Sequence, residues 1–365
     1  MAKRKMDKSL MDALDCILFE ESVDEVFNLL LRFDYTNVKA NLPKEGYNLN
    51  GMDEEERFLY LLSGACYEIE GGGEIGEFAD LLKDEYFEAI DVLSPSSIES
   101  EPYFKLLAKV PHFKDKGMEF GTQKYDAFQP FLSKRRRFCS DFNVLPKPSI
   151  ACFPTTVNYP ALSSGGEIWM SLIPHEIESM KEDFLAFKGK VLIYGLGLGY
   201  AAFEAARKDD VTHVTVVEKD RTILAFFKKH ILPLFPNKEK ITLVEGDAIV
   251  FARTNKEGNF DILFADLWHT GEDGLSIYAN LKRNEGAAKE NHYWVEEEML
   301  IFRRLYLRLI AYFKLGEKEF LEDIEPSPYY PQLRKWLDTK PSLEEDTKAL
   351  LSKENLLKTI LEIIE

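Results

Sequence analysis

Gly195, Gly197 and Gly199 follow directly on an apolar run at 191–194 and lead into a stretch with helical periodicity at 201–207. An apolar run without a polar break is typical of a parallel strand that is buried on both faces. A strand, a glycine turn and a helix in this order present free backbone N–H groups and the positive end of a helix dipole to a ligand. The glycine spacing therefore predicts a ligand-binding turn.

Carboxylates stand at the ends of the next three strand candidates. The strands at 211–217, 241–244 and 260–265 lead to Glu218, to Gly246-Asp247 and to Asp266, respectively. Because the carboxyl ends of parallel strands lie at one edge of a sheet, we expect these side chains to face one crevice. Glu218 follows the turn at the spacing of about 20 residues at which an acid can bind the ribose hydroxyls. The pattern predicts a site for a nucleoside cofactor.

Tyr200 bears on which cofactor the crevice holds. A dinucleotide-binding turn has the spacing G-x-G-x-x-G, with a small residue at the last position. After Gly195 and Gly197 that position is Tyr200, and the third glycine stands at 199 instead. A bulky ring there would obstruct the close packing of helix and strand under a pyrophosphate. The sequence therefore argues against NAD and FAD.

Taken in order, the G-x-G-x-G spacing, the acid after the second strand and the Gly-Asp pair after the third resemble class I S-adenosylmethionine-dependent methyltransferases. The resemblance extends over about residues 165–270, and the most similar branch is the spermidine-synthase-like one. Residues 244–269 resemble that branch's segment from the adenine-binding Gly-Asp to the catalytic aspartate. The resemblance implies an α/β fold with a Rossmann-like core and a parallel sheet, and S-adenosyl-L-methionine as the cofactor.

The resemblance also implies roles for individual residues. Glu218 would bind the ribose, Asp247 would bind the adenine amino group, and Asp266 would position the acceptor and take up its proton. The structural alternatives are a solvated strand end for Glu218 and helix or loop caps for the two aspartates. Histidine titrates near neutral pH, which makes His269 a second candidate general base. The cofactor-binding candidates are Tyr194, Gly195, Gly197, Gly199, Glu218, Lys219, Asp247, Ala248 and Asp266, and the catalytic candidates are Asp266 and His269.

Three positions depart from the pattern of related enzymes. Polyamine synthases carry an acid within the glycine turn and another three residues after the catalytic one, where this chain has Leu198 and His269. Many methyltransferases carry an acid two residues before the first glycine, where Ile193 leaves the cofactor's amino end without a partner. Since cationic amine substrates need paired carboxylates, we interpret the chain as a methyltransferase. Two alternatives stay open: an aminopropyltransferase, and a non-catalytic scaffold that binds a nucleoside.

Composition restricts the acceptor. The 365 residues include 46 basic and 63 acidic side chains, for a net charge of −17. A protein that binds a polyanion is expected to carry a basic surplus, so we expect a small-molecule or protein acceptor and no nucleic acid. The basic run at 134–137 is the one local exception, and we expect it to close a helix and complement its dipole. Whether the chain forms a homo-oligomer stays open.

Cysteine spacing and hydropathy bear on metal binding and on location. Four cysteines are scattered without C-x-x-C spacing, which predicts neither a disulfide framework nor a metal site. The first 15 residues lack the apolar stretch of a signal peptide. The apolar segment at 299–313 is interrupted by Arg303, Arg304 and Arg308, so we expect no membrane span. We expect a cytoplasmic protein.

The sequence predicts four parts. They are a helical N-terminal domain at 1–145, a β-hairpin element at 146–175, the Rossmann-like core at 176–316 and a helical tail at 317–365. Within the first we expect helices at 7–32, 54–70, 78–93 and 101–140, and within the second strands at 149–157 and 167–172. A helix at 177–187 leads into the core.

The region after the fourth core strand departs from the methyltransferase pattern. A fifth strand is expected there, yet 274–315 has helical periodicity and offers no secure strand. Either the sheet is shortened or a strand lies within this apparent helix. Residues 318–340 look irregular, and the final helix opens on Ser342 and Glu345, a capping-box pattern.

Overall fold

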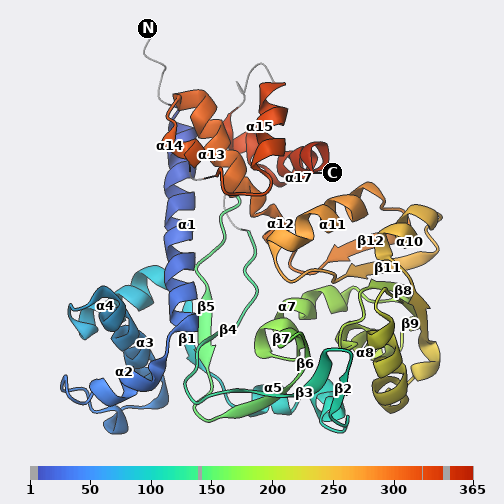
Figure 1. The fold of residues 1–365 in the computed structure, drawn as a ribbon, viewed down its shortest axis with the longest axis horizontal. Helices are drawn as coiled ribbons and strands as arrows, with labels where there is room; N and C mark the ends of the chain where they lie inside the picture. The colour runs from blue at the N-terminus through green and yellow to red at the C-terminus, as the bar shows by residue number, and fades with distance from the viewer. Residues whose placement is uncertain (1–6, 139–141, 323, 340–345, 365) are drawn as a thin grey trace.

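A computed structural model describes residues 7–138, 142–322, 324–339 and 346–364 of the chain. In Figure 1 the N-terminal helices and the core sheet lie at opposite ends, and the C-terminal helices lie between them along one side. Within the described ranges, no helix is long and apolar enough to cross a membrane.

The core is a parallel sheet of five strands in the order β10-β9-β8-β11-β12. The strands are β8 (Gly189–Tyr194), β9 (Val211–Glu218), β10 (Ile241–Glu245), β11 (Phe260–Ala265) and β12 (Ala288–Tyr293). The chain order reverses between β8 and β11, and ligands bind at such a switch point outside the carboxyl ends of the strands. The predicted Rossmann-like fold and its first four strands are confirmed.

Helices cover both faces of this sheet. One face packs against α7 (Pro174–Leu185), α8 (Tyr200–Arg207) and α9 (Arg221–Phe226), and the other against α10 (Ala248–Thr254) and α11 (Gly271–Arg283). Alternate residues of β8 show the division, because Ile193 belongs to the first core and Leu192 to the second. Three short turns follow α9: η3 (Phe227–Ile231), η4 (Leu232–Leu234) and η5 (Lys238–Lys240).

The fifth strand exists and lies within the apparent helix at 274–315, which confirms the second of the two alternatives, so the helical interpretation is wrong at 288–293. β12 pairs in parallel with β11, from Phe260 opposite Ala288 to Ala265 opposite Tyr293. Its sequence, AKENHY, buries only its first and last residues, as suits the outermost strand of the sheet. Such an edge strand has no apolar run to mark it, so pairing with β11 decides its conformation. Helix resumes after it in α12 (Glu296–Leu300) and α13 (Phe302–Leu315).

The N-terminal region begins with helices. These are α1 (Lys8–Arg32), α2 (Tyr35–Asn41), η1 (Leu49–Gly51), α3 (Glu54–Glu70), α4 (Ile75–Leu81) and the π-turn η2 (Leu82–Tyr86). The predicted helices at 7–32 and 54–70 are confirmed. The remainder is mixed: β1 (Ala89–Val92), α5 (Ser96–Glu99), α6 (Pro102–Leu107), β2 (Phe113–Asp115), β3 (Met118–Tyr125) and β4 (Phe131–Leu132). The predictions of helix through residue 93 and over 101–140 are therefore wrong.

Two small sheets join this region to the core. β5 (Ser149–Cys152) lies between β1 and β4, whereas β6 (Val157–Ser164) and β7 (Glu167–Ser171) continue the sheet β2-β3-β6-β7. The predicted hairpin is confirmed, since β6 and β7 pair antiparallel around Gly165 and Gly166. The strand expected at 149–157 is instead split between the two sheets. Figure 1 shows the hairpin sheet beside α7 and α8, next to the core.

The basic run at 134–137 does not close a helix, which corrects that expectation. Arg135 pairs with Asp183 of α7 at 2.9 Å and with Glu297 of α12 at 2.7 Å. Arg136 pairs with Asp24 of α1 at 2.5 Å. The run lies in an irregular segment whose charges connect three helices that are distant in sequence.

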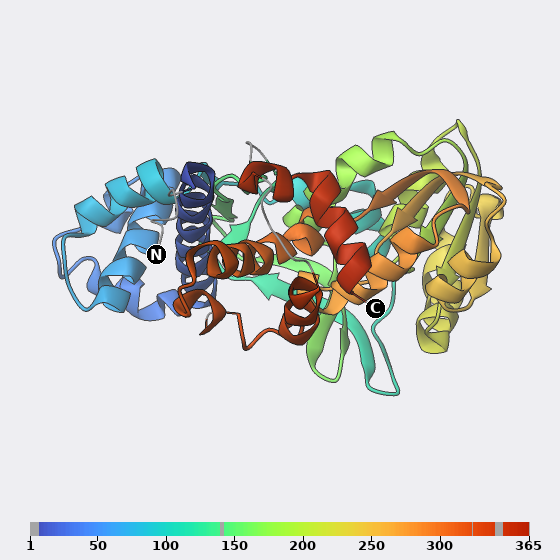
Figure 2. The same cartoon turned by 90° about the horizontal axis from the view of Figure 1, so that it is seen from above.

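The C-terminal region packs against α1 and α11. It contains α14 (Glu319–Glu322), α15 (Tyr330–Asp338), α16 (Thr347–Leu350) and α17 (Lys353–Ile363). Thus 318–340 holds two short helices where irregular chain was expected, and the predicted cap at Ser342 and Glu345 lies outside the described residues. Figures 1 and 2 both show α13 beside α1, and α16 also contacts α1, so the first helix packs against helices from the last part of the chain.

Candidate functional site

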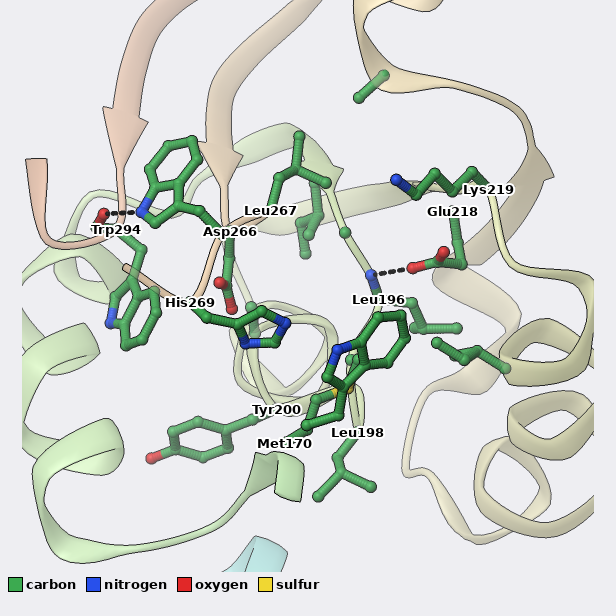
Figure 3. A pocket seen from close by; sticks show the side chains of 18 of the residues that line it. Met170, Leu196, Leu198, Tyr200, Glu218, Lys219, Asp266, Leu267, His269 and Trp294 are labelled. Atoms are coloured by element: carbon green, nitrogen blue, oxygen red, sulfur yellow. Dashed lines mark hydrogen bonds between the residues drawn. The ribbon is translucent and has the colours of Figure 1, made fainter. Parts of the chain in front are cut away.

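A cavity of about 390 Å³ opens at the carboxyl edge of the core sheet. The glycine turn forms its floor, the ends of β9, β10 and β11 form one wall, and the hairpin strand β7 and the start of α7 form the other. Eight sequence-predicted residues line it: Gly195, Gly197, Glu218, Lys219, Asp247, Ala248, Asp266 and His269. Figure 3 shows Glu218 and Lys219 on one side and Asp266 and His269 on the other, with Leu196 between them.

Gly195 and Gly197 are required by the geometry of the turn. Gly195 has a φ of +89°, and a Cβ there would lie 2.0 Å from the carbonyl oxygen of Asp266. Gly197 has a φ of +56°, and its Cβ would lie 3.2 Å from the sulfur of Met170. Because glycine adopts positive φ without steric cost, the turn can pass directly beneath the ends of β7 and β11.

Tyr194 and Gly199, predicted to bind cofactor, do not line the cavity. The Tyr194 side chain is fully buried in the core on the α10–α11 face of the sheet. Gly199 precedes α8 with a φ of +90°, and a Cβ there would lie 2.2 Å from the ring of Phe227. These two residues shape the turn from outside the cavity.

Two side chains hold the glycine turn. The Glu218 carboxylate accepts hydrogen bonds from the backbone N–H of Leu196 at 3.0 Å, drawn in Figure 3, and from that of Asp220 at 2.7 Å. On the other side the buried hydroxyl of Tyr103, in α6, donates to the carbonyl of Leu198. No motif marks Tyr103 in the sequence, because it reaches the turn only through the tertiary fold.

Glu218 therefore serves the turn as well as its predicted ribose. We expect Glu218→Gln to weaken adenosine binding by about ten- to a hundredfold, since hydrogen bonds to a charged group contribute roughly 1.5–3 kcal/mol. Calorimetry with adenosine and with 2′,3′-dideoxyadenosine separates the two roles. If Glu218 binds the ribose, the wild type prefers adenosine and the variant loses that preference.

Glu245→Gln is the matched control, because Glu245 ends the neighbouring strand β10 opposite Glu218 but is exposed. We expect it to leave both affinities unchanged. If Glu218→Gln lowers the affinities for adenosine and for 2′,3′-dideoxyadenosine equally, Glu218 holds the turn but does not bind the ribose.

Asp247 and its neighbours lie at the same end of the cavity as Glu218. Asp247 caps α10, and its Oδ1 accepts the Val250 N–H at 3.0 Å. Lys219 and Ala248 line the cavity beside these two acids. The predicted capping role of Asp247 is confirmed, and contact with adenine stays a prediction.

Asp266 is the cavity-lining acid without a bonded donor among the described residues. Its backbone continues β11, with its N–H donating to the carbonyl of Tyr194 at 2.9 Å. Burial raises the pKa of the Asp266 carboxyl to about 7. Figure 3 shows this carboxylate turned toward His269, whose ring lies 5.7 Å from that of Trp169 in β7. A carboxyl group that titrates near neutral pH suits a general base.

Glu176 lies in the same cavity and was missed as a site residue from the sequence. It belongs to the first turn of α7, where an acid ordinarily complements the helix dipole, so nothing local distinguishes it. Burial, together with the charge of Asp266, raises the pKa of Glu176 to about 8. The Ser171 hydroxyl donates to its Oε1 at 3.0 Å. Glu176 and Asp266 therefore face a common space within electrostatic reach of each other.

Comparison with known proteins finds a domain family over the part of the chain that forms most of this site. Residues 178–276 match the spermine/spermidine synthase domain family. This region contains Glu218, Asp247 and Asp266 and covers about a quarter of the chain. The predicted resemblance to the spermidine-synthase-like branch is confirmed over this range.

Individual relatives match over shorter stretches. Putrescine N-methyltransferase 1 from Nicotiana tabacum is 32% identical over 83 residues, which cover 21% of each chain. The enzyme of the same name from Nicotiana attenuata is also 32% identical over 83 residues, 21% of this chain and 20% of that one. The chain thus spans about a fifth of the length of these relatives. A spermidine synthase structure from Thermotoga maritima aligns at 19% identity and a TM-score of 0.27, over 37% of this chain and 49% of that one.

Proposed function

We propose that the chain is an S-adenosylmethionine-dependent methyltransferase with a small-molecule or protein acceptor. The supporting observation is Asp266: an acid with a pKa of about 7, turned into the cavity beside the glycine turn and bonded to no described donor. Glu218 and Asp247 also line this cavity, and we assign them to the nucleoside of the cofactor. The spermine/spermidine synthase domain match over the same residues agrees with this assignment.

In methyl transfer the protein itself forms no covalent bond with the cofactor or the acceptor. The cofactor would supply a methyl group bound to a sulfonium. The acceptor atom would attack this methyl carbon in line, so that the acceptor–carbon bond forms while the carbon–sulfur bond breaks, and its electron pair leaves with the sulfur of S-adenosylhomocysteine. Asp266 takes the proton that the acceptor atom loses, and its carboxylate orients that atom. Trp169 and His269 both line the cavity, with their rings in tilted contact.

Aminopropyl transfer from the decarboxylated cofactor is the second candidate. Glu176 favours it, because a second acid beside Asp266 suits a cationic amine. Leu198 opposes it: this buried apolar residue occupies the place of the acid in the glycine turn of polyamine synthases. Methyl transfer releases S-adenosylhomocysteine and aminopropyl transfer releases methylthioadenosine, so the by-product formed with cell extract as acceptor source decides between them.

The charge balance supports the choice of acceptor. With a net charge of −17 the chain would repel nucleic acid, so we propose a small molecule or a protein. A cytoplasmic location is part of the proposal, and the oligomeric state stays open.

Cofactor binding is the first expected result. S-adenosylhomocysteine at about 100 times its dissociation constant is expected to raise the free energy of unfolding by about 2.7 kcal/mol, whereas NAD is expected to have no effect. A thermal-shift assay measures both. A shift with NAD and none with S-adenosylhomocysteine or S-adenosylmethionine would contradict the proposed function.

A further inference from the structure

The four carboxylates that line the cavity fall into two pairs. Glu218 and Asp247 each accept hydrogen bonds from backbone N–H groups. Asp266 has no bonded donor among the described residues, and Glu176 is bonded by neutral groups alone, the hydroxyl of Ser171 and the backbone of Ser171 and Ile173. In the second pair, therefore, no described cation is bonded to either carboxyl group, and a carboxylate removed from water is costly unless it is paired.

The cofactor's methionine part brings an ammonium group that needs such a partner. At the two positions where related enzymes carry acids, one in β8 and one within the glycine turn, this chain has Ile193 and Leu198, which are 1% and 5% exposed and apolar. The turn thus offers backbone groups but no charge. Glu176 reaches the same cavity from α7, across from the turn.

We propose that Glu176 holds the ammonium group of the cofactor and so replaces the acid that the glycine turn lacks. This inference rests on the proposed function and assigns Asp266 to the acceptor. An ammonium group carries three donors, and the Glu176 carboxylate, oriented by Ser171, accepts one or two of them. Every S-adenosyl ligand with its methionine part brings this group, whatever the acceptor, which is why we assign Glu176 to the cofactor.

The surroundings of Glu176 predict how binding depends on pH. The titratable groups that face it are Asp266 from β11, Tyr125 from β3 and Tyr159 from β6. Both tyrosines have raised pKa values and are neutral, and among the described residues no cation is bonded to Glu176. With a pKa of about 8, Glu176 holds a proton at pH 7 in the free protein, and an ammonium group favours its release. Affinity for the ammonium ligand should therefore increase from pH 6 to pH 8.

Two ligands test the assignment by calorimetry. S-adenosylhomocysteine carries the ammonium group and no sulfonium, and methylthioadenosine has neither. We expect Glu176→Gln to lower the affinity for S-adenosylhomocysteine by about ten- to a hundredfold. The affinity for methylthioadenosine should change by less than about twofold. The increase in affinity with pH should shrink in the variant. Glu178→Gln, an exposed acid of the same helix, is the control and should alter neither affinity.

The outcomes separate this inference from the proposed function. If the wild type binds neither ligand nor S-adenosylmethionine, the proposed function fails. Suppose that the wild type binds S-adenosylhomocysteine, but Glu176→Gln lowers the affinities for both ligands equally or leaves both unchanged. Then Glu176 does not hold the ammonium group. If Glu176→Gln loses turnover but keeps its affinity for S-adenosylhomocysteine, Glu176 binds a charge of the acceptor instead, and the inference is overturned. The variant's melting temperature is measured first, and Glu176→Asp, which keeps the charge, should retain part of the affinity.

Discussion

Asp266→Asn is expected to lower turnover by about 10²–10⁴-fold, the range for a positioned acid or base, while S-adenosylhomocysteine affinity stays close to that of the wild type. Asparagine keeps the shape of the side chain but cannot take up the acceptor's proton. Release of S-adenosylhomocysteine from S-adenosylmethionine, with cell extract as acceptor source, measures turnover without knowledge of the acceptor. Undiminished release in the variant would remove Asp266 as the catalytic residue, and no release by the wild type would favour a nucleoside-binding scaffold.

The pH profile gives this prediction a second readout. Since burial raises the pKa of Asp266 to about 7, the base form accumulates above that pH, and turnover should rise between about pH 6 and pH 8. The same raised pKa means that the folded protein binds a proton that the unfolded chain has lost, from about pH 4 to pH 7. The free energy of unfolding therefore falls as pH rises through this window. Asp266→Asn removes that loss, so at pH 8 its melting temperature should equal or exceed that of the wild type.

Asp261→Asn is the matched control for Asp266→Asn. Asp261 lies near the opposite end of the same strand, β11, where it bonds Lys289 and the backbone N–H of Lys190. It does not line the cavity. We expect the control to change stability slightly and turnover not at all.

Glu20→Ala is expected to lower the free energy of unfolding by about 3–5 kcal/mol, the cost of removing one partner from a buried ion pair. Glu20 of α1 and Arg303 of α13 both have fully buried side chains and bind each other. Glu20 also bonds Arg304 at 2.9 Å and the backbone N–H of Leu145 at 2.8 Å. Its loss would leave the buried Arg303 guanidinium without its carboxylate, where α1 meets α13. Chemical denaturation monitored by circular dichroism measures the change.

Glu21→Ala separates burial from charge. Glu21 follows Glu20 in α1 and pairs with Arg308 of the same partner helix, but its side chain is 27% exposed. Partly exposed pairs contribute about 0–1 kcal/mol, so we expect a much smaller loss of stability. Similar losses in the two variants would contradict the role of the buried pair.

Local sequence determined the nucleotide-binding half of the site. Four apolar runs predict four parallel strands, and topology places their carboxyl ends at one edge, so Glu218, Asp247 and Asp266 could be assigned to one crevice from the sequence. The glycine turn was also predictable, because positive φ at Gly195 and Gly197 requires that residue type. In these segments local preference and global fold agree.

Tertiary structure alone decided the remaining features. β12 is a polar edge strand whose conformation depends on its pairing with β11, so no periodicity marks it. Tyr103 and Glu176 lie in short helical segments whose composition looks ordinary, and only packing brings them to the glycine turn and the cavity. The basic run at 134–137 resembles a helix end in sequence, yet its acidic partners come from three helices far along the chain. Chemistry that depends on burial and on distant partners leaves no local pattern, because neither is a property of the neighbouring residues.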